Sequence, residues 1–593
     1  MSTYQDRLQA LRDQLARDRL TGFVVPLTDE HMSEYVGAYA QRLAWLTGFQ
    51  GSAGSAVVLP EEAAIFTDGR YTLQVREQVD GSHWQYQGIP QTSVAAWLGE
   101  HAPEGGRIGY DPWLHTRRWV EDATAALKAK GAKLVAVDTN PVDAIWPDRP
   151  APGKARVEPH DDAYAGQSSA DKRAAIADWL KARGADAVVL SALDSIAWAF
   201  NIRGRDVERT PVALAFALVN DDAAADLYVD PAKVDADLKI HLGDDVFIHD
   251  RADFDKHLGM LGDQTVVVDP ARAVAAIFNR LDDAGATILP LRDPTVLPKA
   301  TKNGTEIAGH RAAQARDGAA LSRFLHWLSV EGPKGGQTEM SAADRLHAFR
   351  AEGGLLVDLS FDTIAGSGPN GAVVHYRAEE KTNRPVETGT LLLVDSGGQY
   401  RDGTTDVTRT VAIGTPTDEM RRNFTLVLKG HIALATATFP KGTRGGQLDV
   451  LARQFLWAHG LDYAHGTGHG VGSFLSVHEG PQRIATSTEG DEPLAAGMIV
   501  SNEPGYYKTG EYGIRIENLV LVEPRAIAGA EREMLGFETL TLAPIDRALI
   551  DLPLLTAAER TWLDAYHARV LDVIGPQLDG AARAWMEGAC AAL

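Results

Sequence analysis

Cysteine is almost absent from this sequence, because Cys590 is the only one among 593 residues. A single cysteine cannot form a disulfide within the chain, so nothing in the sequence requires an oxidising compartment. Structural zinc sites built on several thiolates are excluded for the same reason. We therefore expect a cytoplasmic protein.

Long apolar runs are also missing. No run approaches the roughly 18 uninterrupted apolar residues of a membrane span. The first residues, MSTYQDRLQALRDQL, carry charges throughout and lack the apolar centre of a signal peptide. We expect neither insertion into a membrane nor export by an obvious route.

Basic residues are outnumbered, since 58 Lys and Arg stand against 80 Asp and Glu for a net charge of -22. This charge repels nucleic-acid phosphates and anionic lipid surfaces unless a local basic patch overrides it. The sequence contains no such patch. Nucleic acid and membranes are therefore not expected as partners.

The length indicates about three domains, since domains usually run about 100 to 200 residues. Five prolines in NPVDAIWPDRPAPGKARVEP predict a linker, and DPTVLPKATKNGTE predicts a second boundary before a helix that begins at Glu306. Leu, Trp and Val spacing predicts helices in LIDLPLLTAAERTWLDAYHARVLDVI. We expect domains at 1–155, 156–300 and 301–593, with a helical extension from about residue 545.

The first two predicted domains share a pattern. An apolar strand, GFVVP, precedes Trp45, and a similar segment, GADAVVL, precedes Trp198. Alternating strands and helices indicate mixed α/β structure. The repeated order favours a duplicated domain.

Two segments of the third region carry paired carboxylates. In LLLVDSGGQYRDGTTDVTRTVAIG, a strand ending at Asp395 and a second strand carrying Asp406 predict a hairpin with both acids on facing positions. In MIVSNEPGYYKTGEYGIRIENLVLV, Glu503 and Glu517 occupy a second strand-turn-strand. Residue alternation places Arg515 on the same face as Glu517.

Four converging carboxylates repel one another unless they are protonated or bind cations. An isolated acid beside a glycine is more often a turn residue than a ligand, but here the acids occur together with HGTGHGVGSFLSVHEGP. Glycines around His465 and His469 let the backbone approach a crowded site. A carboxylate-rich site with one imidazole suits Mn²⁺ or a similar ion, which predicts a hydrolase. His431 and His459 are interpreted as packing or surface residues.

Several segments resemble the pita-bread metallopeptidases, and specifically the three-domain Xaa-Pro aminopeptidases (the aminopeptidase P family). They are HGTGHGVG, VHEGP, DSGGQYRDGTTDVTRT, SNEPGYY and GIRIEN. The resemblance covers the whole chain. It implies an α/β (α+β) protein with two similar creatinase-type N-terminal α/β domains, a pita-bread catalytic domain and a helical C-terminal extension.

The resemblance implies a site with two divalent metal ions. Asp395 and Asp406 bind one ion, His469 and Glu503 bind the other with Asp406, and Glu517 bridges both. A hydroxide between the ions is the implied nucleophile, and Mn²⁺ is the favoured metal. Paired ions lower the pKa of a shared water, a physical reason that does not depend on the family name.

The resemblance also implies roles around the metals. Glu503 is the implied proton shuttle, and His465 and His478 match histidines that hydrogen-bond the substrate carbonyl and its oxyanion. His375 matches the histidine near the proline pocket and the leaving group. Tyr507 and Arg515 match residues of the pocket or of the shell around the ligands, although an ordinary ion pair on a strand explains Arg515 nearly as well.

The activity implied is hydrolysis of the bond between the N-terminal residue and a penultimate proline of peptides, by a homodimer with Trp457 as a candidate contact. Three alternatives stay open. Prolidase is restricted to dipeptides and usually lacks a second N-terminal domain, and relatives of the fold without metals act as binding modules or chaperones. Methionine aminopeptidase is disfavoured because about 300 residues precede the catalytic region.

Overall fold

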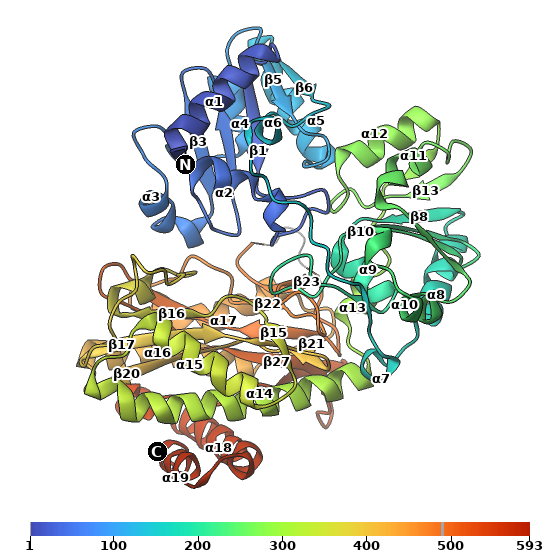
Figure 1. The fold of residues 1–593 in the computed structure, drawn as a ribbon. Helices are drawn as coiled ribbons and strands as arrows, with labels where there is room; N and C mark the ends of the chain where they lie inside the picture. The colour runs from blue at the N-terminus through green and yellow to red at the C-terminus, as the bar shows by residue number, and fades with distance from the viewer. Residues whose placement is uncertain (1, 488–491) are drawn as a thin grey trace. The chain divides into compact units, whose positions relative to one another are not determined.

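The computed structural model describes residues 2–487 and 492–593. The chain folds into two compact units. The first comprises Met1–Asp162 and Gln167–Val296, and the second comprises Ala163–Gly166 and Leu297–Leu593. Figure 1 shows strands and helices in both units.

The first unit contains two six-stranded sheets. One has the order β4-β3-β2-β1-β5-β6, with bounds β1 Gly22–Pro26, β2 Ser55–Val58, β3 Ala63–Thr67, β4 Gln85–Gly88, β5 Arg107–Tyr110 and β6 Lys133–Ala136. The other has the order β12-β11-β10-β8-β13-β14, with bounds β8 Ala187–Leu190, β10 Ala215–Asn220, β11 Ala225–Val229, β12 Val246–His249, β13 Thr265–Val267 and β14 Thr287–Leu289.

The two sheets share one topology. The central strand, β1 or β8, pairs antiparallel with the strand on one side and parallel with the strand on the other. Trp45 lies in α2 (Arg42–Thr47) after β1, and Trp198 lies in α9 (Leu193–Ala199) after β8. The duplication expected from the sequence is therefore confirmed.

Helices pack on these sheets through apolar faces. In α1 (Tyr4–Arg17), Leu8, Leu11 and Leu15 are buried at the helical spacing that the sequence shows. The unit also contains α3 Gln74–Gln78, α4 Val94–His101, α5 Arg117–Leu127, α6 Pro141–Ile145, α8 Ser169–Lys181, α10 Ala236–Leu242, α11 Phe254–Leu258 and α12 Ala275–Ala284.

The second unit consists of antiparallel sheets and long helices. A six-stranded sheet has the order β21-β28-β27-β24-β22-β23, with bounds β21 Thr438–Pro440, β22 Gly468–Gly470, β23 Glu479–Ile484, β24 Ile499–Asn502, β27 Asn518–Arg525 and β28 Met534–Thr539. Smaller sheets are β16-β17-β20, β15-β18-β19 and β25-β26, with bounds β15 Leu356–Leu359, β16 Ile364–Ser367, β17 Thr390–Ser396, β18 Gly398–Tyr400, β19 Gly403–Thr404, β20 Val407–Ile413, β25 Gly505–Lys508 and β26 Tyr512–Arg515.

This unit contains the helices α14 Gly304–Glu331, α15 Glu339–Glu352, α16 Asp418–Ala435 and α17 Gly445–Trp457. The sequence predicts that α14 begins at Glu306, whereas the helix begins at Gly304. The side chain of Asn303 caps it, and the Glu306 carboxylate in turn accepts a hydrogen bond from the backbone N–H of Asn303. Phe324 and Leu325 of α14 then join a buried cluster with Leu392 of β17.

The C-terminal helices are α18 (Ala557–Ile574) and α19 (Gly580–Ala589). Leu563 and Val570 of α18 lie in one buried cluster with Phe424 and Leu428 of α16. The helical extension expected from the sequence is therefore confirmed and packs on the second unit. Within the described ranges, no helix combines the length and the apolar character that crossing a membrane requires.

Candidate metal centre

Two carboxylates converge at one end of the pair formed by β17 and β20. Asp395 lies in β17 opposite Thr408, and Asp406 directly precedes β20. Both side chains are buried. A Cβ atom at Gly397 would overlap the carbonyl oxygen of Thr405, so this tight connection requires glycine. The strands pair as the sequence predicts, but Asp395 faces Thr408 and not Asp406, because Asp406 lies one residue before β20.

Two more carboxylates flank the pair formed by β24 and β27. Glu503 directly follows β24, and Glu517 directly precedes β27. The sequence predicts one strand-turn-strand, but β25 and β26 form a separate ribbon between the two acids. Pro504 has no amide N–H to continue a strand ladder, which accounts for the break.

The imidazole of His469 comes from β22, between β23 and β24. Its Nδ1 lies 2.9 Å from the carbonyl oxygen of Gly470, so Nδ1 carries the proton and the lone pair of Nε2 is directed at the carboxylates. Nε2 lies 3.4 Å from Asp406 Oδ2 and 3.6 Å from Glu503 Oε1. A Cβ atom at Gly468 would overlap the carbonyl oxygen of Ser501 in β24, so glycine lets these strands approach.

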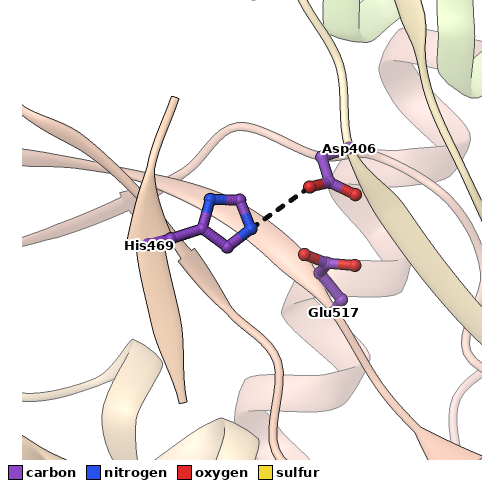
Figure 2. Close-up of side chains that lie close together, drawn as sticks. All are labelled: Asp406, His469 and Glu517. Carbon is purple, nitrogen blue, oxygen red and sulfur yellow. Dashed lines mark ion pairs between the residues drawn. The ribbon is translucent and has the colours of Figure 1, made fainter. Parts of the chain in front are cut away.

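Figure 2 shows Asp406, His469 and Glu517 facing one another from separate segments. One donor atom of each lies within 4.8 Å of the others. This spacing and the mixed oxygen and nitrogen donors suit a divalent cation.

Charge in the centre is unbalanced. Burial, and then the neighbouring carboxylates, raise the pKa of Asp406 and of Glu517 well above the usual range. Burial also raises the pKa of Glu503. Within the described residues, Asp395 Oδ1 is buried without a hydrogen-bond partner. A bound cation satisfies such an oxygen and relieves the repulsion, so the donor set fits divalent metals.

Arg515 is the buried cation beside these acids. Its Nη2 donates to Asp395 Oδ2 at 2.7 Å, and its Nε donates to Thr408 Oγ1 at 3.1 Å. The Thr408 hydroxyl in turn donates to Glu517 Oε2 at 2.8 Å. Sequence reasoning missed Thr408, although it stands two residues after Asp406 and therefore on the same face of the strand.

Hydrogen bonds through Tyr507 also connect Arg515 to His465. Arg515 Nη1 donates to the Tyr507 oxygen at 2.6 Å, and that oxygen lies 2.8 Å from His465 Nε2. The phenol proton is therefore directed at Nε2. Nδ1 of His465 lies 2.7 Å from the carbonyl oxygen of Gly466 and donates to it.

The other predicted histidines lie at different places. The His478 ring centroid lies 4.4 Å from that of His469. His375 is half-buried, and the carbonyl oxygen of the preceding Val374 accepts from Arg515 at 3.3 Å. His431 is buried between Asn502 and Asn518, whereas His459 is exposed.

Comparison with known protein families agrees with this geometry. Residues 308–524 match metallopeptidase family M24, and residues 533–593 match its C-terminal region. Residues 7–145 and 148–306 match two models of the creatinase/prolidase N-terminal domain. The chain belongs to metallopeptidase family M24.

Several known proteins are similar to this chain over nearly its whole length. A probable Xaa-Pro aminopeptidase P of Laccaria bicolor is 42% identical, over 99% of this chain and 93% of the relative. A probable Xaa-Pro aminopeptidase P of Aspergillus niger is 41% identical, over 95% of this chain and 94% of the relative. The X-prolyl aminopeptidase of Caenorhabditis elegans, described as a cytosolic enzyme with a di-nuclear active site, superposes with a TM-score of 0.95 at 35% identity over 100% of both chains. The resemblance to three-domain Xaa-Pro aminopeptidases is confirmed.

Proposed function

We propose that this protein is an aminopeptidase that uses two divalent metal ions to release the N-terminal residue from peptides with proline in second position. The observation that carries the proposal is the buried group of Asp406, His469 and Glu517 with its unbalanced charge. Family membership and the relatives along the full length support it.

Five side chains are assigned to the ions. We assign Asp395 and Asp406 to one ion, His469 and Glu503 with Asp406 to the other, and Glu517 to both; Mn²⁺ is the proposed metal. Divalent cations, when bound, polarise a peptide carbonyl and lower the pKa of water. Arg515 holds Asp395 in place and reduces the net negative charge.

Protein groups around the ions handle protons and orientation. We assign to Glu503 the transfer of a proton to the leaving nitrogen, and to His465 and His478 the orientation of the substrate carbonyl and its developing negative charge. His465 Nε2 accepts from Tyr507 while Nδ1 carries the ring proton, so donation to substrate requires both release of the Tyr507 hydroxyl and a proton on Nε2. His375, Tyr507 and Arg515 are assigned to binding of the residue in second position.

An Xaa-Pro bond has no amide N–H, so recognition through that donor is impossible and a dedicated contact surface is needed. The test is hydrolysis of Xaa-Pro-Xaa tripeptides, Xaa-Pro dipeptides and Xaa-Ala-Xaa tripeptides by enzyme reconstituted with Mn²⁺. We expect cleavage of the first group only. Preference for dipeptides would indicate a prolidase, and no cleavage with any added metal would indicate a binding module.

Glu503→Gln provides the matching residue test. It keeps the shape of the side chain and removes its negative charge, so we expect turnover to fall by about a thousandfold or more with little change in secondary structure. A variant that remains fully active would refute the role given to Glu503.

We propose that the chain divides into domains at 1–155, 156–300 and 301–593, that it acts as a homodimer, and that it works in the cytoplasm. The exposure of Trp457 supports the proposal of a dimer, since 45% of this large apolar residue is exposed at the end of α17. Trp457→Glu should shift the mass measured by light scattering from dimer to monomer. An unchanged mass would show that Trp457 is not a subunit contact, and fractionation of the source cells tests the location.

A further inference from the structure

The chain between β16 and β17 forms a long irregular loop. After a short 3-10 helix (Gly368–Ala372), residues 373–389 contain neither helix nor strand. His375 lies in this segment. Irregular segments of this length hold one conformation only where other groups anchor them.

Glu339 is such an anchor. It is the first residue of α15, and it is fully buried. Oε1 accepts from the Ser367 amide at 2.7 Å and from Asn370 Nδ2 at 3.0 Å. Oε2 accepts from the Tyr376 hydroxyl at 2.8 Å and from the Arg384 amide at 2.8 Å.

These donors come from both sides of His375. Ser367 and Asn370 precede it, and Tyr376 and Arg384 follow it. A single carboxylate therefore ties together the start and the end of the loop. The backbone of Arg384 adds a further tie, because its carbonyl oxygen accepts from the Glu339 amide at 3.0 Å.

The residues on either side of His375, Val374 and Tyr376, are both held by hydrogen bonds. The carbonyl oxygen of Val374 accepts from Arg515, and the hydroxyl of Tyr376 donates to Glu339. The backbone on one side of His375 is thus tied to the metal centre, and the side chain on the other side is tied to α15. This arrangement limits where the imidazole can point.

The chemistry of the anchor requires an ionised acid. Each of the four groups that contact the Glu339 oxygens is an N–H or O–H donor, so a carboxylate accepts from all of them. A glutamine has one acceptor oxygen, and its NH₂ group would face donors. Glu339→Gln thus removes the anchor with almost no change of volume.

We propose that Glu339 is a positioning residue that fixes the loop 367–384 so that His375 meets the residue in second position of the substrate. The inference rests on the proposed function, which supplies the substrate. Glu339 does not touch the reacting atoms. Small displacements of a substrate-contacting group are costly in rate, since an error of about 1 Å can cost 10²-fold.

The test is a double-mutant cycle read out as kcat/KM on an Xaa-Pro-Xaa tripeptide. We expect Glu339→Gln to lower kcat/KM about tenfold and the milder Tyr376→Phe about threefold, with metal content unchanged by elemental analysis. In the His375→Ala background, both changes should have almost no further effect, because the side chain that they position is absent.

Tyr400→Phe is the matched control. Tyr400 is also a buried phenol in the second unit, and it donates to the Asp317 carboxylate at 2.8 Å. Loss of the Tyr400 hydroxyl should change kcat/KM by the same factor in the wild type and in the His375→Ala background. Should Glu339→Gln fail to fold, Tyr376→Phe still decides the question.

Two results overturn the inference. In the first, Glu339→Gln and Tyr376→Phe lower kcat/KM by the same factor in the His375→Ala background as in the wild type. In the second, both single variants are as active as the wild type. Failure of the proposed function looks different, because the wild-type enzyme itself then leaves the tripeptide intact.

Discussion

Lys302 donates through Nζ to Oε1 of Glu479 in the interior of the second unit. Lys299 Nζ donates to the other oxygen of the same carboxylate at 2.9 Å. All three side chains are at most 1% exposed. Since Glu479 directly follows His478, two lysines that precede α14 hold the residue next to a proposed substrate-contacting histidine.

Glu479→Gln should lower the free energy of unfolding by about 3–5 kcal/mol, because it leaves two buried ammonium groups without their shared anion. Urea denaturation followed by circular dichroism measures this change. Glu533→Gln is the control, since Glu533 and Lys441 form an ion pair with side chains 73% and 68% exposed. We expect almost no effect there, because exposed ion pairs contribute little to stability. Equal effects at the two sites would contradict the argument.

Removal of metal should lower the melting temperature as well as the activity. The buried acids repel one another without cations, and a ligand at 100 times its dissociation constant stabilises the folded state by about 2.7 kcal/mol. Differential scanning calorimetry with and without a chelator checks this, and added Mn²⁺ should restore both properties. In Asp406→Asn the melting temperature should respond much less to the chelator. A wild-type protein that melts at one temperature in all conditions would exclude a structural contribution from metal.

Arg515→Lys should lower kcat/KM by about 100-fold. The guanidinium donates to Asp395, Thr408, Tyr507 and Val374, and a single ammonium group cannot reproduce that planar set of donors. Steady-state kinetics on the tripeptide gives the answer. Arg311→Lys, at an arginine whose side chain is 49% exposed and pairs with Glu538, should keep full activity. Comparable losses in both variants would mean that the arrangement around Arg515 is unimportant.

Stability should fall in acid in part through His310. Burial lowers its pKa to about 3, and both ring nitrogens lack hydrogen-bond partners within the part of the chain that the structure describes. The unfolded chain binds a proton near pH 6.5 and the folded chain only near pH 3. Stability from this group is therefore complete above about pH 6.5 and is lost as the pH falls toward 3.

His310→Leu should reduce the acid slope of the unfolding free energy by up to about 1.4 kcal/mol per pH unit, which is the contribution of one proton. Denaturation curves between pH 5 and 7 measure the slope. If the slopes of the wild type and His310→Leu coincide, His310 is not responsible for the loss.

Local patterns predicted the two strand pairs that carry the acids. The sequence predicts an apolar strand ending at Asp395 and a second strand carrying Asp406, because alternation and turn residues act over a few positions, although Asp406 itself lies one residue before β20. The two α/β halves could be predicted for the same reason, from a strand followed by a tryptophan.

Contacts between distant segments could not be predicted. The segment around Lys299 and Lys302 is rich in prolines and turn formers and is typical of an exposed connection, yet both lysines are buried. Their partner Glu479 lies about 180 residues away, and no local pattern links them. Glu339 looks like an ordinary acid in the first turn of a helix, because the donors that surround it belong to a loop without regular structure.

The two sheets of the first unit have the same strand order, and the segment that joins them can be cut without breaking either sheet. Residues 147–156 contain neither helix nor strand, and they lie between β6 and β8. A protease that cuts there interrupts no strand ladder, and each fragment keeps all six strands of its own sheet. Such a cut would not by itself release the N-terminal half, because the Ala275 amide donates to the carbonyl oxygen of His115 at 2.7 Å and both belong to one compact unit.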